Sequence, residues 1–144
     1  MSQVTIAIGQ MCANGPKEQN LAKITRMAED AAINHAPDVI VFPEYCYYAP
    51  VDSKDSLAAA ETLEGPYIAA VSALAKKHRV NIIPGSFVEK AGENKVYNVS
   101  VFIDRNGNIA GKYRKIHLMK AMSYDESSYV EYGQDIAVFD NDIG

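Results

Sequence analysis

The stretch Val39-Ile40-Val41-Phe42-Pro43-Glu44 places four consecutive apolar residues directly before a proline and an acid. An apolar run without polar alternation is typical of a parallel strand that is covered on both of its faces. Pro43 and Glu44 close this run. The stretch therefore predicts a buried strand over residues 39–42 in an α/β fold, with a carboxylate at the strand's end.

The residues before this strand predict another strand and a helix. Val4 to Met11 is rich in β-branched residues and carries no charge, which favours a strand. From Lys17 to about His35, apolar residues recur at three- and four-residue spacing, which indicates a helix with one buried face. The resulting β-α-β order predicts a right-handed crossover and a sheet with helices packed on it.

The residues after it predict a second helix and an antiparallel end of the sheet. Gly65-Pro66 opens the helix, and the cations near its C-terminus suit the helix dipole. A strand over 80–88, interrupted by Pro84-Gly85, comes before a hairpin signalled by Asn106-Gly107. Both helices are expected on one face of this mixed sheet, with no obvious cover for the other face. The other expected segments are hairpin strands over 96–103 and 109–118, an aromatic-rich loop over 45–56, a loop or irregular helix over 120–132, and a short strand beginning over 136–139.

Composition and length fit one domain without a membrane or nucleic-acid partner. The 144 residues are 48% hydrophobic and 22% charged, as in an average soluble protein. The net charge of −4 disfavours nucleic acid, which usually needs a basic face. We expect no secretory leader, because the first residues lead directly into a strand-like stretch, and no apolar run is long enough to cross a bilayer. Two cysteines, Cys12 and Cys46, give no disulfide framework, so we expect a reducing, cytoplasmic setting.

Two charged side chains are candidates for chemistry. Ligands collect beyond the carboxyl ends of the strands in open α/β sheets, so Glu44 can serve as a general base there, or can simply be a solvated loop carboxylate. Lys115 lies in Tyr113-Arg114-Lys115-Ile116-His117-Leu118. Its ammonium group can stabilise an oxyanion, or can be an ordinary solvent-facing lysine. The three histidines share no metal-binding spacing with the cysteines and there is no phosphate loop, so the residues predict neither a metal site nor a phosphate-binding site.

The motifs occur together in an informative order. The stretches over 39–44 and 113–118, with Tyr97-Asn98-Val99-Ser100 between them, resemble the nitrilase, or carbon-nitrogen hydrolase, superfamily, and residues 4–10 resemble its first strand. The resemblance implies that Glu44 is the general base and Lys115 the oxyanion stabiliser. It also implies that Glu126, in Tyr124-Asp125-Glu126-Ser127, helps to position the substrate and the lysine, although Glu126 can equally be a loop acid.

The resemblance also implies a cysteine nucleophile, which this chain does not supply at the expected place. Residues 138–144 resemble the segment just before that cysteine. We therefore expect residues 1–144 to form a single, incomplete hydrolase domain, half of an α-β-β-α sandwich, that is inactive alone. Cys46 lies two residues from Glu44 and is a conceivable substitute, but it does not match the family position, and a free cysteine is most often a small buried hydrophobe. Cys12 is a weaker candidate still.

Two functions follow as expectations. The first is a cofactor-free carbon-nitrogen hydrolase that acts on a small-molecule amide, carbamoyl compound or nitrile and pairs into a homo-oligomer, as the resemblance implies. The alternative is a non-catalytic binding or assembly module that retains a hydrolase-like half-fold and uses its uncovered sheet face. The aromatic residues over 45–48 can line a substrate pocket or pack at a dimer surface.

Overall fold

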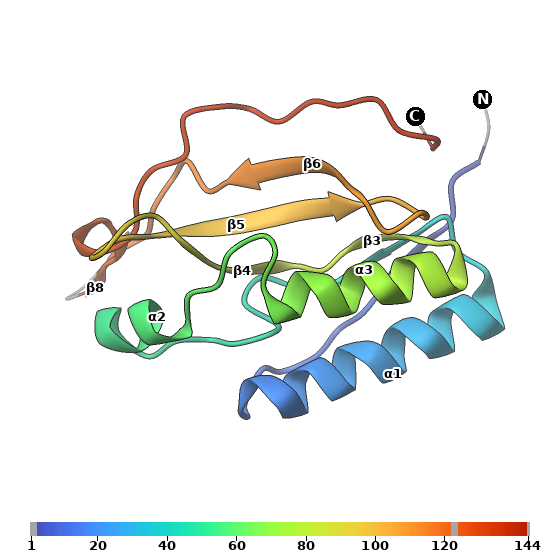
Figure 1. The fold of residues 1–144 in the computed structure, drawn as a ribbon, viewed down its shortest axis with the longest axis horizontal. Helices are drawn as coiled ribbons and strands as arrows, with labels where there is room; N and C mark the ends of the chain where they lie inside the picture. Colours follow the sequence, from blue (N-terminus) through green and yellow to red (C-terminus); the bar gives the residue numbers. More distant parts are fainter. Residues whose placement is uncertain (1–2, 122–123, 144) are drawn as a thin grey trace.

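The computed structural model describes residues 3–121 and 124–143, and its centre is a six-stranded mixed sheet (Figure 1). β1, β2 and β3 are parallel neighbours, and β5 runs antiparallel to β3, β4 and β6. β3 and β4 follow each other along the same edge of β5, separated by Pro84-Gly85. The strands are β1 (Ile6–Ile8), β2 (Val39–Val41), β3 (Asn81–Ile83), β4 (Ser86–Lys90), β5 (Val96–Ile103) and β6 (Ile109–Arg114).

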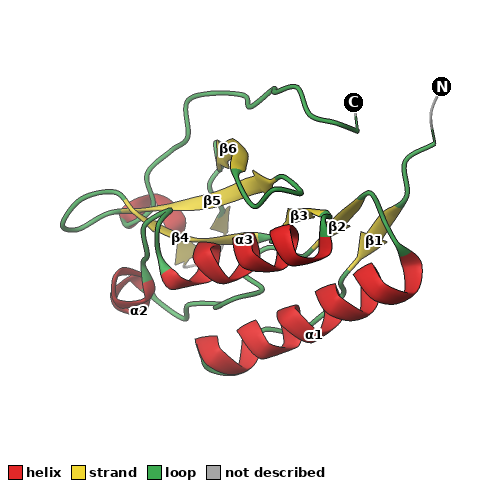
Figure 2. Cartoon of the chain, turned by 45° about the vertical axis from the view of Figure 1, so that its right-hand side comes forward, coloured by secondary structure: helices red, strands yellow, loops and turns green. Residues whose placement is uncertain are grey.

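The two long helices, α1 (Lys17–His35) and α3 (Pro66–His78), lie side by side on one face of the sheet (Figure 2). The main core fills the space between these helices and the strands. It includes Ile24, Ala28, Ile40, Tyr67, Val71, Ile82, Val99 and Ile103. The predicted mixed sheet with two helices on one face is confirmed, and one helical layer on one sheet is half of an α-β-β-α sandwich.

The ends of these helices follow from local sequence chemistry. Pro16 is the N-cap residue of α1, and Gly65 is that of α3, whose first residue is Pro66. Proline suits such a start because the missing N–H would have no helical partner there. Each helix ends on a residue in the left-handed region, Ala36 in α1 and Arg79 in α3. This conformation stops the helix and turns the chain back toward the sheet.

Two glycines with positive φ fix turns that the sequence predicted. Gly107 has a φ of 85° in the tight turn between β5 and β6, where Asp104 exchanges backbone hydrogen bonds with Gly107 and Asn108. Gly85 has a φ of 73° between β3 and β4. A side chain at Gly85 would collide with the carbonyl oxygen of Pro43. Because residue 85 is glycine, the chain that follows β2 can lie directly against the break between β3 and β4.

Several predicted segments differ in the structure. The first strand is shorter than residues 4–11. The predicted loop over 45–56 contains the start of α2 (Ser53–Ala59), which the side chain of Asp52 caps through the Asp55 N–H at 2.8 Å. Residues 120–132 hold a small hairpin, β7 (Lys120–Ala121) with β8 (Tyr124–Asp125), and a 3₁₀ turn at Glu126–Ser128, in keeping with an irregular segment.

The predicted strand over residues 136–139 is wrong for the chain as described. Its side chains do alternate, because Ile136 and Val138 are exposed while Ala137 and Phe139 are half-buried. The segment pairs with no strand among the described residues, and a strand is defined by its ladder rather than by alternation alone. The alternating pattern is therefore present without the hydrogen-bonded partner that would make it a strand.

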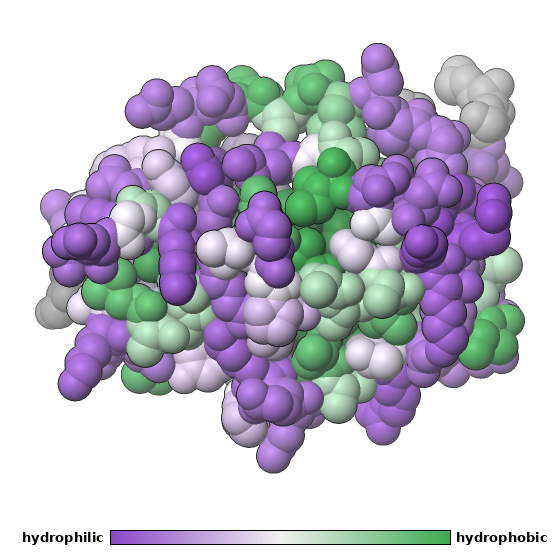
Figure 3. Space-filling view, viewed as in Figure 1, coloured by the Kyte–Doolittle hydropathy of each residue, from purple (hydrophilic) through white to green (hydrophobic). Residues whose placement is uncertain are grey.

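The sheet face opposite the helices is only partly covered. The segment after residue 131 crosses that side (Figure 2), where the Phe139 ring lies 5.3 Å from that of Phe102. Ile6 and Ile8 remain 57% and 79% exposed. In Figure 3, hydrophobic surface shows between polar side chains in the middle of the molecule. None of the helices in the described residues has the length and apolarity needed to cross a membrane.

Candidate active site

Strand direction brings the candidate residues to one edge of the sheet. β6 is antiparallel to β5, and β5 is antiparallel to β3, so β6 runs in the same direction as β2. Glu44 follows the carboxyl end of β2 and Lys115 follows that of β6. Asn98 lies near the start of β5, which runs the other way and therefore begins at this same edge. Ligands bind at this edge in open α/β sheets.

Glu44 receives two donors on a single oxygen. Lys115 Nζ lies 3.2 Å from Glu44 Oε1, and Asn98 Nδ2 donates to the same oxygen at 2.6 Å. The Glu44 side chain is 55% exposed, so it faces outward from the end of its strand. The carboxylate is thus in contact with the lysine that the sequence pairs with it, although 71 residues separate the two.

Lys115 is held between two carboxylates. Its Nζ lies 3.1 Å from Glu126 Oε2 in addition to its contact with Glu44. Burial alone would lower the pKa of Lys115, but the hydrogen bonds and charges of Glu126 and Glu44 outweigh burial, so the pKa of Lys115 is raised. The side chain therefore carries a positive charge at neutral pH, as an oxyanion stabiliser must.

The backbone of Lys115 is fixed on both sides. Its N–H donates to the Asn98 carbonyl at 2.9 Å, and its carbonyl accepts from the Gly133 N–H at 2.9 Å. A side chain at Gly133 would collide with the carbonyl of Arg114, so only glycine lets the two segments approach this closely. Lys115 lies beyond the last residue of β6, but these two hydrogen bonds still anchor the backbone from which its side chain projects.

Glu126 is the buried member of the group. It is 3% exposed, and its Oε2 accepts the Met119 N–H at 2.6 Å. Its backbone N–H in turn donates to the Met119 carbonyl at 3.0 Å. A buried carboxylate is stable only when it is paired and hydrogen-bonded. Lys115 and Met119 supply those partners, and Glu126 in turn gives the lysine a second carboxylate besides Glu44.

A hollow opens in front of these side chains. It has a volume of about 290 Å³ and is lined by Phe42, Glu44, Ile83, Gly85, Ser86, Asn98, Ser100, Tyr113 and Lys115. Its walls are mostly apolar, and the Glu44–Lys115 pair with Asn98 forms a polar group at its edge. This is the usual character of a small-molecule site. The described residues contain no cluster of side chains suited to hold a metal ion.

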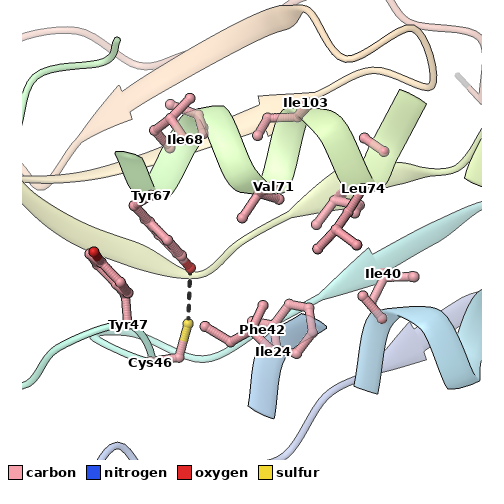
Figure 4. Close-up of a cluster of buried hydrophobic side chains, with 14 of the residues drawn as sticks. Ile24, Ile40, Phe42, Cys46, Tyr47, Tyr67, Ile68, Val71, Leu74 and Ile103 are labelled. Atoms are coloured by element: carbon pink, nitrogen blue, oxygen red, sulfur yellow. Dashed lines mark hydrogen bonds between the residues drawn. The ribbon is translucent and has the colours of Figure 1, made fainter. Parts of the chain in front are cut away.

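Cys46 belongs to the core and not to this hollow. It is 2% exposed, and its Sγ donates to the Pro84 carbonyl at 3.1 Å and contacts the Tyr67 hydroxyl at 3.4 Å (Figure 4). Burial raises the pKa of the Cys46 thiol to about 11. A nucleophilic cysteine needs the opposite environment, which stabilises a thiolate. Cys12 is exposed and likewise absent from the hollow's lining.

The aromatic residues over 45–48 take structural roles. Tyr47 is 6% exposed, and its ring stacks on that of Tyr67 at 4.1 Å. The Tyr48 hydroxyl donates to Asp55 Oδ1 at 2.8 Å and so contacts the first turn of α2. Neither ring is among the residues that line the hollow. These two tyrosines therefore do not line this hollow, and packing of this segment at a dimer surface stays a prediction.

Comparison with known proteins agrees with this arrangement. The family model described as carbon-nitrogen hydrolase matches residues 5–144. The chain belongs to the carbon-nitrogen hydrolase family. A citrullinase of Francisella tularensis is 32% identical over 136 residues, which cover 92% of this chain and 47% of that protein. A probable nitrilase of Schizosaccharomyces pombe is 33% identical over 131 residues, covering 88% and 46%.

The fold agrees as well. A crystal structure of a carbon-nitrogen hydrolase from Helicobacter pylori superposes with a TM-score of 0.82 at 25% identity, over 91% of this chain and 45% of that one. The chain thus spans about half the length of the relatives that it matches.

The structure adds Asn98 to the three site residues that the sequence named. Glu44 and Glu126 each contact Lys115, and the catalytic roles of all three stay predictions. The sequence placed Asn98 in a family-like stretch over 97–100 without giving it a role. The signal was an asparagine in a mostly apolar strand, since a buried amide needs partners. Here those partners are part of the site itself.

Proposed function

We propose that this chain supplies the Glu-Lys part of a carbon-nitrogen hydrolase that cleaves a small-molecule amide, carbamoyl compound or nitrile. The observation that carries the proposal is the Lys115 ammonium held between Glu44 and Glu126 at 3.2 and 3.1 Å at the edge of a hollow. An exposed carboxylate beside a permanently charged ammonium provides a base and an oxyanion stabiliser together.

In an amide substrate, Glu44 takes the proton of a cysteine thiol while the sulfur bonds to the carbonyl carbon. The electron pair of the C=O bond moves to oxygen, and Lys115 stabilises that negative charge. When the oxyanion collapses, the C–N bond breaks, and the nitrogen leaves with the proton from Glu44. Glu44 then takes a proton from water as the water oxygen attacks the thioester, and returns that proton to sulfur when the C–S bond breaks, so the acid is released and the thiol is regenerated.

The nucleophilic cysteine of this proposal lies outside the 144 residues. Two observations support that part. Cys46 is buried with a raised pKa, and no cysteine lines the hollow in the described part of the chain. The relatives are also about twice as long as the matched region. By this proposal, the 144-residue chain alone does not turn over substrate.

The test is a turnover assay that follows ammonia release from a panel of amides, carbamoyl compounds and nitriles. It compares the 144-residue chain with the longest polypeptide that its gene encodes. We expect no turnover by the 144-residue chain. We expect the longest encoded polypeptide to turn over substrate, and Glu44→Gln and Lys115→Met each to abolish that turnover. Turnover by the 144-residue chain that survives Cys12→Ala and Cys46→Ala would overturn the cysteine mechanism.

A second candidate function is a non-catalytic module that binds a partner through the open sheet face. The exposure of Ile6 and Ile8 favours it, because large apolar patches mark interaction surfaces. The same assay separates the two functions. If the longest encoded polypeptide shows no turnover with any of the substrates, the module is favoured and the hydrolase is not.

Two broader expectations belong to the same proposal. Pairing into a homo-oligomer follows from the family resemblance, and a reducing, cytoplasmic setting is supported by two cysteines that are both unpaired. Mass measurement by light scattering and fractionation of cells that express the protein test them directly.

A further inference from the structure

We propose that Asn98 is a positioning residue that fixes the Glu44 carboxylate, so that a particular oxygen of Glu44 accepts the proton. The inference rests on the proposed function. It starts from an asymmetry in the site: both donors to Glu44, Asn98 Nδ2 at 2.6 Å and Lys115 Nζ at 3.2 Å, reach Oε1. Oε2 receives no donor from the residues that the structure describes, so its lone pairs are free to take a proton.

Asn98 is the more rigid of the two donors. It is 4% exposed and lies in β5, where it pairs with Val88 of β4 on one side. On the other side its carbonyl accepts the Lys115 N–H at 2.9 Å. One residue therefore holds Glu44 through its side chain and Lys115 through its backbone. The Glu44 carboxylate and the backbone from which Lys115 projects are thus tied to the same buried residue of the sheet.

The lysine cannot replace this function. Lys115 is shared with Glu126, and its flexible stem lets the ammonium follow either carboxylate. The terminal torsion of a glutamate is broad, and the Glu44 side chain is 55% exposed, so nothing intrinsic fixes its orientation. An asparagine amide donates hydrogen bonds but does not titrate, so it can orient the base without competing for the proton.

Catalysis depends strongly on such positioning. A misplacement of about 1 Å can reduce a rate by roughly 100-fold even when every reacting group is present. In the active polypeptide, Asn98→Ala is therefore expected to lower kcat by roughly 10- to 100-fold and leave KM nearly unchanged. Asn98→Asp has almost the same shape but offers an acceptor to Glu44, so it is expected to be the more damaging substitution.

The first arm of the test is kinetic. Asn98→Ala is measured in the active polypeptide, with kcat and KM determined separately. Asn81→Ala is the matched control, since Asn81 is a fully buried asparagine of β3 that hydrogen-bonds the Asp38 carbonyl and Asp142, away from the hollow. It should lower the melting temperature but keep the kcat of the folded protein.

The second arm needs no turnover and uses the 144-residue chain. The acylation rate of Lys115 by an amine-reactive ester is followed by mass spectrometry. Glu44 raises the pKa of Lys115 and so slows this reaction. Asn98→Ala should release Glu44 to solvent and speed the labelling about as much as Glu44→Gln does, whereas Asn81→Ala should leave the labelling rate unchanged.

The outcomes separate this inference from the function on which it rests. A kcat within about two-fold of the parent for Asn98→Ala, or an unchanged labelling rate, overturns the positioning role. If no encoded polypeptide turns over substrate, the proposed function fails. The labelling arm then still decides whether Asn98 fixes Glu44 against Lys115. An equal kcat loss for Asn81→Ala would show a general effect of destabilisation and would also overturn the inference.

Discussion

Glu126 is the residue whose loss should most disturb the site. Glu126→Ala leaves the Met119 N–H without its acceptor and the Lys115 ammonium with Glu44 alone, so we expect the free energy of unfolding to fall by about 2–3 kcal/mol. Urea unfolding measures it. The matched control is Glu131→Ala, whose side chain is 44% exposed and pairs with Lys95 at 3.6 Å, and which should change stability by less than about 0.5 kcal/mol. Equal effects would contradict a structural role for Glu126.

The two cysteines should differ sharply in reactivity. Cys12 is exposed, while Cys46 is 2% exposed and its thiol has a pKa raised to about 11. At pH 8, iodoacetamide should modify Cys12 within minutes and Cys46 only when the chain unfolds, because the thiolate is the reactive form. Peptide mapping by mass spectrometry measures both rates. Fast labelling of Cys46 in the folded chain would reopen its candidacy as a nucleophile.

The same thiol predicts a loss of stability at alkaline pH. The pKa of Cys46 is raised on folding, so the folded state holds the proton more tightly than the unfolded state. The corresponding stability is fully present below about pH 9 and disappears as the pH rises toward 11, at most about 2–3 kcal/mol. Unfolding curves at several pH values measure it. Cys46→Ser keeps a donor to Pro84 and does not titrate, so its curve should be flatter; an identical slope would contradict this origin.

Between elements, the critical contact is that of the Pro84-Gly85 break with the chain that follows β2. In Gly85→Ala, the new methyl group meets the Pro43 carbonyl and the backbone keeps a φ of 73°, so we expect a loss of at least 3 kcal/mol. Gly92→Ala is the matched control. Its φ is 122° but nothing lies within 4 Å, so it reports backbone strain alone, about 1 kcal/mol. Thermal or urea unfolding measures the stability of both variants. Equal losses of stability would contradict the expected collision, because the chain would then have relieved the contact with Pro43.

Elements defined by local chemistry could be predicted from the sequence. The buried face of α1, the break at Pro84-Gly85 and the turn at Asn106-Gly107 each depend on residues that are close in the chain. α2 was missed because aromatic residues before it dominated that stretch, although Asp52 and Asp55 form a short capping pattern. The prediction of a strand over 136–139 was wrong for another reason. Alternation indicates a strand, but it does not show whether a neighbouring strand is present to pair with it.

The site was predicted less through geometry than through resemblance. Position alone left Glu44 and Lys115 as an ordinary loop acid and lysine, and only the order of the motifs connected them. The structure shows why, because their contact depends on the direction of β6, which two successive antiparallel pairings set. Asn98 could not be assigned a role in advance, since its partner lies 54 residues away.

For the whole molecule, the decisive feature is a sheet covered by helices on one face and by a single extended segment on part of the other. β1 is an edge strand, and its Ile6 and Ile8 side chains point away from the helix-side core, which Ala7 contacts. An exposed apolar edge with unpaired backbone groups is a template for association. We therefore expect the 144-residue chain to associate with itself as its concentration rises.

Size-exclusion chromatography with light scattering measures this association. The double variant Ile6→Lys/Ile8→Lys should shift the chain toward the monomer, because two charges on an edge strand disfavour pairing of edges and burial of the face. Val51→Lys is the matched control, since Val51 is 83% exposed just before α2 and distant in sequence from β1, and it should leave the association unchanged. If the chain is instead a monomer at every concentration and unfolds cooperatively, this prediction is contradicted. One helical layer would then be enough to stabilise the sheet, and the open face would not drive association.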